Sequence, residues 1–166
     1  MNTKTQRIVV TALMAALACV ATMIIKIPSP LKGYLNLGDC IVLVCGWILA
    51  PGYGFVAAGL GSALADLFSG YVIYAPVTFI IKGTMALIAF FCFKLMHKRI
   101  GNLPSRLIGG FLAEVFMAIG YYVFDGFMYG FKASLVNIPS NCAQAALGLI
   151  IGVILIKVFE KANIIH

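Results

Sequence analysis

The stretch TFIIKGTMALIAFF, residues 78–91, consists almost entirely of apolar side chains and contains a single charge, Lys82. Across the chain of 166 residues, hydrophobic residues make up 63% and charged residues 10%. Soluble domains carry roughly 25% charged residues, so this chain has too few charges to cover a soluble surface. The sequence therefore predicts an all-α integral membrane protein in which segments such as residues 78–91 cross the bilayer.

We expect a single membrane domain, residues 1–166, built as a bundle of six transmembrane helices. A helix needs about 20 apolar residues to cross the hydrocarbon core, and prolines and glycines separate the apolar runs. The N-terminal run is expected to be retained as the first helix because no cleavage site of small residues ends it. The expected helices cover residues 8–25, 37–50, 53–68, 76–95, 107–124 and 139–159.

The basic residues predict how the bundle is oriented. Eight of the twelve Lys and Arg lie on the side of the two termini, three lie on the other side, and Lys82 lies within the membrane. Basic residues are enriched on cytoplasmic loops, so we expect both termini in the cytoplasm. The outer loops are then residues 26–36, 69–75 and 125–138, and residues 97–106, HKRIGNLPSR, form an inner polar loop.

The sequence argues against several classes of function. The net charge of +7 comes without a long basic run, so no nucleic-acid partner is expected. Nucleotide-binding glycine motifs, metalloprotease motifs and a Ser-His-Asp set on one side of the membrane are all absent, so we expect no enzyme and no cofactor. The cysteines are expected to be buried apolar residues and not metal ligands; they are Cys19, Cys40, Cys45, Cys92 and Cys142.

An ionisable residue inside a membrane span costs about 2.5–3.5 kcal/mol on insertion scales and indicates function by default. Lys82 lies six residues after Pro76, which is about 9 Å along a helix. Its ammonium group could extend to the outer interface as an anchor, or it could face an internal cavity. Thr78, one turn away on the same face, favours the cavity.

Two stripes of polar residues point to the same outer half of the bundle. Glu114, Tyr121 and Asp125 share one face of the fifth helix, because residues three and four apart lie on one face. Asn137, Asn141 and Gln144 form a corresponding face on the sixth helix, with Gly148 below them. Together with Lys82 they predict a concave substrate-binding site that opens outward, although amides also join helices to one another.

Tyrosines are expected to form the walls of that site or a belt at the membrane interface. They are Tyr71, Tyr74, Tyr121, Tyr122 and Tyr129. Asn36 precedes the second helix and is a candidate substrate-binding residue. Asp39 is expected to cap that helix, with ligand contact as the alternative. Asp66 ends the third helix and is also a candidate substrate-binding residue, expected to pair with Lys82 or with a loop.

Three stretches of the sequence resemble the substrate-binding S component of energy-coupling factor (ECF) transporters, the small bacterial vitamin-uptake proteins. They are TALMAALACVA at residues 11–21, the segment at residues 34–68 that begins YLNLGDCIVL, and APVTFIIKG at residues 75–83. The resemblance covers nearly the whole chain and is strongest for the riboflavin-type and hydroxymethylpyrimidine-type branch.

This resemblance implies a bacterial plasma-membrane protein whose pocket near the outer face is formed by loops and by the last three helices. The ligand would be a flavin, pyridine or pyrimidine vitamin or precursor. Ala12, Ala15 and Ala16 would dock a transmembrane T component, and two cytoplasmic ATPases would complete the importer. Internal helix packing is the alternative role for these alanines.

We therefore expect Lys82 to line the pocket and donate to the ligand, with Glu114 or Asp66 balancing its charge. The alternatives are a structural or assembly subunit without a ligand and, less favoured, a small channel.

Overall fold

The computed structural model describes residues 3–29 and 34–162, so Lys32 of the first outer loop lies outside the described residues. Six helices of at least eleven residues form the bundle, as expected. They are α1 (Lys4–Ile24), α2 (Gly38–Ile48), α3 (Pro51–Phe68), α4 (Ala75–Ile100), α5 (Asn102–Tyr129) and α7 (Ile138–Lys161). The connections contain the strands β1 (Lys26–Pro28) and β2 (Tyr34–Asn36), the short helix α6 (Phe131–Ser134) and the 3-10 turn η1 (Leu135–Asn137).

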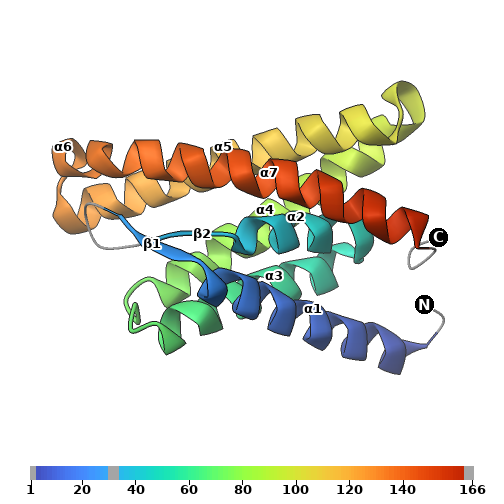
Figure 1. Ribbon diagram of the computed structural model, residues 1–166, viewed down its shortest axis with the longest axis horizontal. Coiled ribbons are helices and arrows are strands. Elements are labelled where there is room, and N and C mark those ends of the chain that lie inside the picture. The colour runs from blue at the N-terminus through green and yellow to red at the C-terminus, as the bar shows by residue number, and fades with distance from the viewer. Residues whose placement is uncertain (1–2, 30–33, 163–166) are drawn as a thin grey trace.

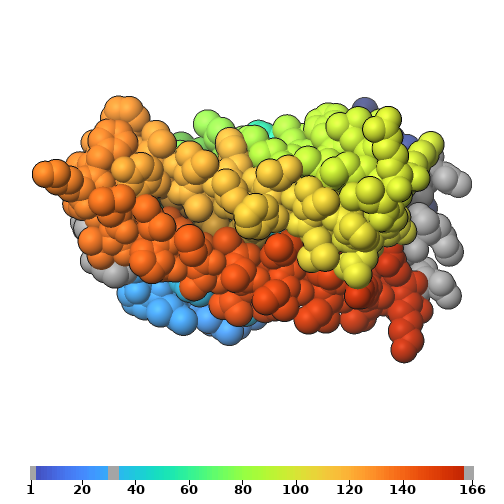
Figure 2. Space-filling model, turned by 90° about the horizontal axis from the view of Figure 1, so that it is seen from above, coloured from blue at the N-terminus to red at the C-terminus, as the bar shows by residue number. Residues whose placement is uncertain are grey.

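The helices run back and forth along the long axis of the molecule, so that α1 begins and α7 ends at the same end (Figure 1). The opposite end carries β1 and β2, the turn between α3 and α4, and α6 (Figure 1). We call this the hairpin end, and the other the terminal end. Seen from above, α5 and α7 lie side by side and cover one face of the molecule (Figure 2).

Helix α2 forms the centre of the bundle. All of its residues from Gly38 to Trp47 are buried, and Leu43 and Val44 have no exposed surface. A helix that is apolar all round is stable only when other elements enclose it. At eleven residues, α2 is about 16 Å long, which is too short to cross a bilayer by itself.

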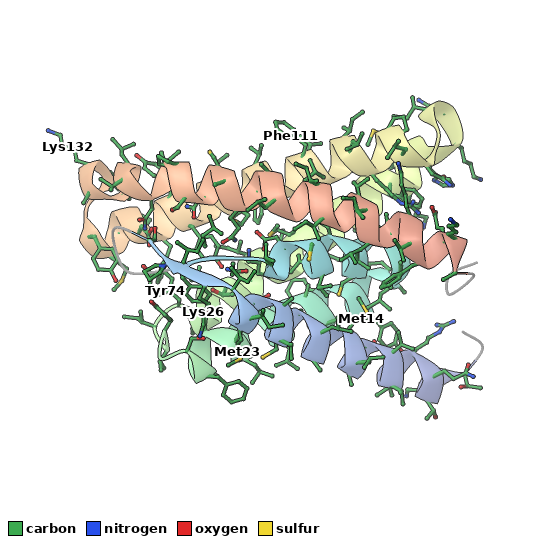
Figure 3. All side chains as sticks on the ribbon, viewed as in Figure 1. Met14, Met23, Lys26, Tyr74, Phe111 and Lys132 are labelled. Carbon is green, nitrogen blue, oxygen red and sulfur yellow. The ribbon has the colours of Figure 1, made fainter. Side chains whose placement is uncertain are left out.

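The outer faces of the bundle are apolar. Large hydrophobic side chains on several helices are more than half exposed, including Phe111, Ile150 and Leu13, and Phe111 points away from the bundle (Figure 3). Within the described residues, four segments are long and apolar enough to span a membrane: Lys4–Ile24, Ala75–Ile100, Asn102–Tyr129 and Phe131–Lys161. Exposed apolar surface of this extent is what a protein solvated by lipid presents.

Two of the expected loops are wrong. Residues 97–106 do not form a polar loop, because α4 continues to Ile100 and α5 begins at Asn102. Gly101 alone makes the turn, with a positive φ of 86° that glycine adopts without strain. Residues 125–138 are also mostly helical, since α5 extends to Tyr129 and α6 and η1 follow.

The first outer connection is an antiparallel hairpin and not an irregular loop. β1 pairs with β2 in a register that places Lys26 opposite Asn36 and Ile27 opposite Leu35. The all-α expectation therefore misses two short strands. Their pairing gives the connection between α1 and α2 a regular structure.

Small residues bring α1 and α3 into close contact. A Cβ atom added at Gly61 would lie 2.3 Å from the carbonyl oxygen of Ala15 and 2.8 Å from the Cβ of Ala18. Small residues allow such backbone approach in membrane bundles. Ala15 is therefore buried against α3, which contradicts the expectation that it docks a partner, whereas Ala12 and Ala16 are exposed on the outer face of α1.

The Gly61→Ala substitution should destabilise the protein by about 1–3 kcal/mol, the usual cost of overpacking, because the new methyl group meets backbone that is fixed in a helix. Gly52→Ala is the matched control, since a Cβ there has no neighbour within 4 Å. Thermal unfolding in detergent micelles checks this, and equal melting temperatures for the two variants would contradict the close α1–α3 contact.

Candidate functional site

A pocket opens at the hairpin end of the bundle. It has a cavity volume of about 50 Å³ and is partly open to solvent. Residues from the hairpin and from α3, α4, α5 and α7 contribute to its walls. They are Ser29, Tyr34, Asn36, Asp66, Tyr71, Tyr74, Thr78, Tyr121, Asp125, Asn137, Asn141 and Gln144.

Most of the expected binding residues lie around this one pocket. Both polar stripes meet there, because Tyr121 and Asp125 of α5 face Asn141 and Gln144 of α7 across it. Asn36, Asp66, Tyr74 and Asn137 complete this set. Lys82 and Glu114 are the two expected residues that do not line the pocket.

The hairpin forms one wall and is tied to the helices on both sides. The Tyr34 hydroxyl donates to Oδ1 of Asp66 over 2.6 Å, and the Ser29 hydroxyl donates to Oδ1 of Asn137 over 2.6 Å. Lys26, which lies near the turn between α3 and α4 (Figure 3), donates to the Ser69 hydroxyl over 2.9 Å. Asp66 thus pairs with a loop residue, one of the two partners expected for it.

Tyr34 is a proton donor under all ordinary conditions. Burial, together with the negative charge of Asp66, raises the pKa of Tyr34 above its usual value. Removing its proton would place two negative charges side by side in a partly buried site. The Tyr34–Asp66 hydrogen bond therefore holds the hairpin to α3 across the physiological pH range.

The wall formed by α5 centres on the carboxylate of Asp125, which is 2% exposed. Its Oδ1 accepts a hydrogen bond from the Tyr74 hydroxyl and its Oδ2 accepts one from Nδ2 of Asn137, each over 2.8 Å. The hydroxyls of Thr78 and Tyr121 lie 3.0 Å apart and share a hydrogen bond. These contacts join α4, α5 and η1 around the pocket.

Aromatic rings form a continuous part of the lining. The ring centroids of Tyr34 and Tyr71 are 4.9 Å apart, and those of Tyr71 and Tyr74 are 6.3 Å apart. Such a surface suits stacking against a flat ring. The other two tyrosines considered from the sequence, Tyr122 and Tyr129, do not line the pocket.

The floor of the pocket rests on a buried polar network. Oε1 of Gln144 accepts from the backbone N–H of Asn36 over 2.9 Å and from its Nδ2 over 3.1 Å. Nε2 of Gln144 donates to Oδ2 of Asp39 over 2.7 Å. The other carboxylate oxygen of Asp39 accepts from the ammonium group of Lys82. The network therefore connects β2, α7, α2 and α4.

Lys82 and Asp39 do not take the roles expected from the sequence. Lys82 does not line the pocket, and at 3% exposure it does not reach the membrane interface as an anchor either. Its ammonium group forms a salt bridge with Asp39, and none with Glu114 or Asp66 in the described residues. Asp39 is fully buried and makes no capping hydrogen bond at the start of α2. A buried ammonium group needs a carboxylate partner more than a helix start needs a side-chain cap.

Glu114 lies deeper in the bundle, beside the Asp39–Lys82 pair. It is 2% exposed, and neither of its carboxyl oxygens has a hydrogen-bond partner among the described residues. Gly148 makes room for both carboxyl groups, because a Cβ there would lie 2.7 Å from Oε1 of Glu114 and 2.7 Å from the Cβ of Asp39. The glycine below the amide stripe thus serves close packing.

Sequence analysis missed Ser29 and Tyr34 as lining residues. Both lie in or beside the hairpin. Their positions depend on the pairing of β1 with β2, and strands this short give no recognisable pattern in the sequence. The signal in the sequence is the aromatic side chain of Tyr34, at the start of the stretch YLNLGD before the second helix.

A sequence model described as ECF-type riboflavin transporter, S component, matches residues 2–161. The chain belongs to this family. It is an integral protein of the plasma membrane and the substrate-binding subunit of an ECF-type importer, and it is not an enzyme. ECF S components bind small vitamin substrates and work with a T component and ATPases.

The chain is also similar to two curated proteins over most of its length. The chain is 35% identical over 134 residues to an uncharacterized protein of Pyrococcus woesei, covering 80% of this chain and 87% of that protein. It is 21% identical over 167 residues to the thiamine precursor transporter HmpT of Lactococcus lactis, covering 99% and 94%.

Among solved structures, the S component of a bacterial ECF transporter superposes with a TM-score of 0.76 at 23% identity, covering 98% of each chain. The S component for biotin from an ECF-type ABC transporter superposes with a TM-score of 0.53 at 21% identity, covering 93% and 92%. These two likenesses show that the fold is that of an ECF S component.

Replacing Lys82 by Met should destabilise the ligand-free protein by about 3–5 kcal/mol, because it leaves the buried carboxylate of Asp39 without a counter-charge. The double variant Lys82→Met, Asp39→Asn should recover most of this loss, since it removes both charges. Thermal unfolding in detergent measures both. A Lys82→Met protein as stable as the parent would show that the pair is unimportant for folding.

Proposed function

We propose that the protein captures a flat, vitamin-like molecule from outside the cell in the pocket at the hairpin end. The cargo then passes inward through the T component and two ATPase subunits. The observation that carries the proposal is the convergence of five structural elements on one pocket with tyrosine walls and buried polar groups. A bundle that only assembled other subunits would not need these polar side chains around an open space.

The position of the pocket supports capture from outside. The eight basic residues on the side of the termini fall at the terminal end or close to it, and the pocket lies at the opposite end. With the termini in the cytoplasm, as the basic residues predict, the pocket faces the exterior.

The lining of the pocket favours a molecule with a flat aromatic ring. Stacked tyrosines suit the faces of such a ring, and the amides and carboxylates suit its polar edge. The family description names riboflavin, and the relative HmpT is a thiamine precursor transporter. Flavins, pyridines and pyrimidines are therefore the compounds to test first.

The outer face of α1 supports docking to the T component. Ala12 and Ala16 are exposed and lie one helical turn apart, so they leave a flat strip on which a partner helix can approach closely. Neither alanine is needed for internal packing, in contrast to Ala15.

Purified protein should carry its cargo, or bind it when offered. We expect mass spectrometry of the molecule released on denaturation to identify a flavin, pyridine or pyrimidine compound at about one per protein. Adding that compound back to emptied protein should raise the melting temperature, because a ligand that binds only the folded state stabilises it. An empty protein whose melting temperature no vitamin of a broad panel changes would instead favour an assembly subunit without a ligand.

Ala16→Trp should reduce co-purification with the T component while ligand binding is retained, because the indole ring would hold the partner helix away from α1. Ala146→Trp is the matched control, since Ala146 is an exposed alanine on α7. Affinity capture from membranes that contain all subunits measures the effect. Equal recovery of the T component with both variants would remove α1 as the docking face.

A further inference from the structure

The acidic residues of the protein are concentrated around the pocket. The chain has five Asp and Glu and a net charge of +7. Four of the five acidic residues, Asp39, Asp66, Glu114 and Asp125, are buried in the pocket walls or directly beneath them. The fifth, Glu160, pairs with Arg106 near the terminal end over 2.7 Å. The local charge is thus opposite in sign to that of the whole chain.

The pocket carboxylates lack cationic partners among the described residues. Lys82 is engaged by Asp39, and no salt bridge to Asp66 or Asp125 occurs in the described part of the chain. Lys26 is exposed and donates to Ser69, and Lys132 points away from the bundle (Figure 3). Two carboxylates, 6% and 2% exposed, therefore line the cavity without a salt-bridge partner in the described part of the chain.

The hydrogen-bond donors of the lining are mostly used within the wall itself. The hydroxyls of Tyr34 and Tyr74 point their protons at Asp66 and Asp125, and the amide of Asn137 donates to Asp125. A phenol that donates in this way retains oxygen lone pairs, and each carboxylate oxygen accepts more than one hydrogen bond. The surface left for a ligand is therefore rich in acceptors.

Few donors remain on that surface. Gln144 uses one of its two amide N–H groups on Asp39, and Asn36 uses one of its two on Gln144. Among the described lining residues, the Asn141 amide and the Tyr71 hydroxyl make no hydrogen bond, so their donors and the second amide N–H groups of Gln144 and Asn36 remain for a ligand acceptor group.

We propose that the ligand presents an amino group, aromatic or protonated, or a positively charged ring nitrogen to Asp66 and Asp125 of the pocket. This inference rests on the proposed function and narrows its substrate class. Burying a charged carboxylate is costly unless it is paired, and a cationic or amine-bearing ligand supplies that pair. A neutral ring that carries mainly carbonyl acceptors would leave both carboxylates without an opposite charge in the occupied pocket.

Two matched pairs of probes test the inference on emptied, purified protein by calorimetry. Pyridoxamine and pyridoxine differ by an amine in place of a hydroxyl. A 4-amino-5-hydroxymethylpyrimidine and its 4-oxo counterpart differ by an amino group in place of an oxo group. Riboflavin is the fifth probe and represents the flavins. We expect the amine of at least one pair to bind about ten times more tightly than its hydroxyl or oxo counterpart, and more tightly than riboflavin.

The variant Asp66→Asn should reduce the affinity for that amine probe at least tenfold. The amide oxygen of the new side chain can still accept the hydrogen bond from Tyr34. Asp125→Asn is the second variant and should act in the same way. Glu160→Gln is the matched control, because it makes the same chemical change near the terminal end, and it should leave the affinity unchanged.

Three results would overturn the inference: equal or tighter binding of the hydroxyl and oxo counterparts or of riboflavin, unchanged affinity in both aspartate variants, or binding of none of the five probes. The proposed function is judged separately, by the molecule released from the protein. A released vitamin without an amine or a positive charge would support the binding function and overturn the inference alone.

Discussion

The buried ion pair between Lys82 and Asp39 determines how the central elements of this bundle pack against one another. It joins α4 to α2, and through Gln144 and Asn36 it also fixes α7 and β2. Each member of the network is buried to 7% exposure or less. In such a site water cannot solvate the two charges if they separate, so any arrangement that separates them is strongly disfavoured. The apolar surfaces provide most of the burial, and this network selects one register among the many that apolar surfaces allow.

The short helix α2 explains why a pocket exists at all. Its residues fill the middle and the terminal end of the bundle, but it begins only at Gly38, below the hairpin. The longer helices α4, α5 and α7 continue past that point toward the hairpin end (Figure 1). The volume that another two turns of α2 would occupy is instead enclosed by the hairpin and lined by side chains of its neighbours. The polar network of Asn36, Asp39, Gln144 and Lys82 at the start of α2 therefore lies directly beneath a ligand in the pocket.

Much of this arrangement could be predicted from the sequence, because helical periodicity places residues on faces. The spacing of Tyr121 and Asp125, and of Asn141 and Gln144, was sufficient to place these side chains around one site. Partners between helices could not be predicted in the same way. Asp39 and Lys82 are 43 residues apart, and nothing in their local sequence distinguishes a helix cap from an ion pair. The hairpin was missed because its strands have three residues each, which is too short for an alternating pattern to be detected.

Beneath the polar network at the floor of the pocket, α2 continues with fully buried apolar residues, including Val42, Leu43 and Val44. They belong to the main hydrophobic core of the described residues. A polar molecule bound in the pocket therefore meets packed apolar side chains in the direction of the terminal end.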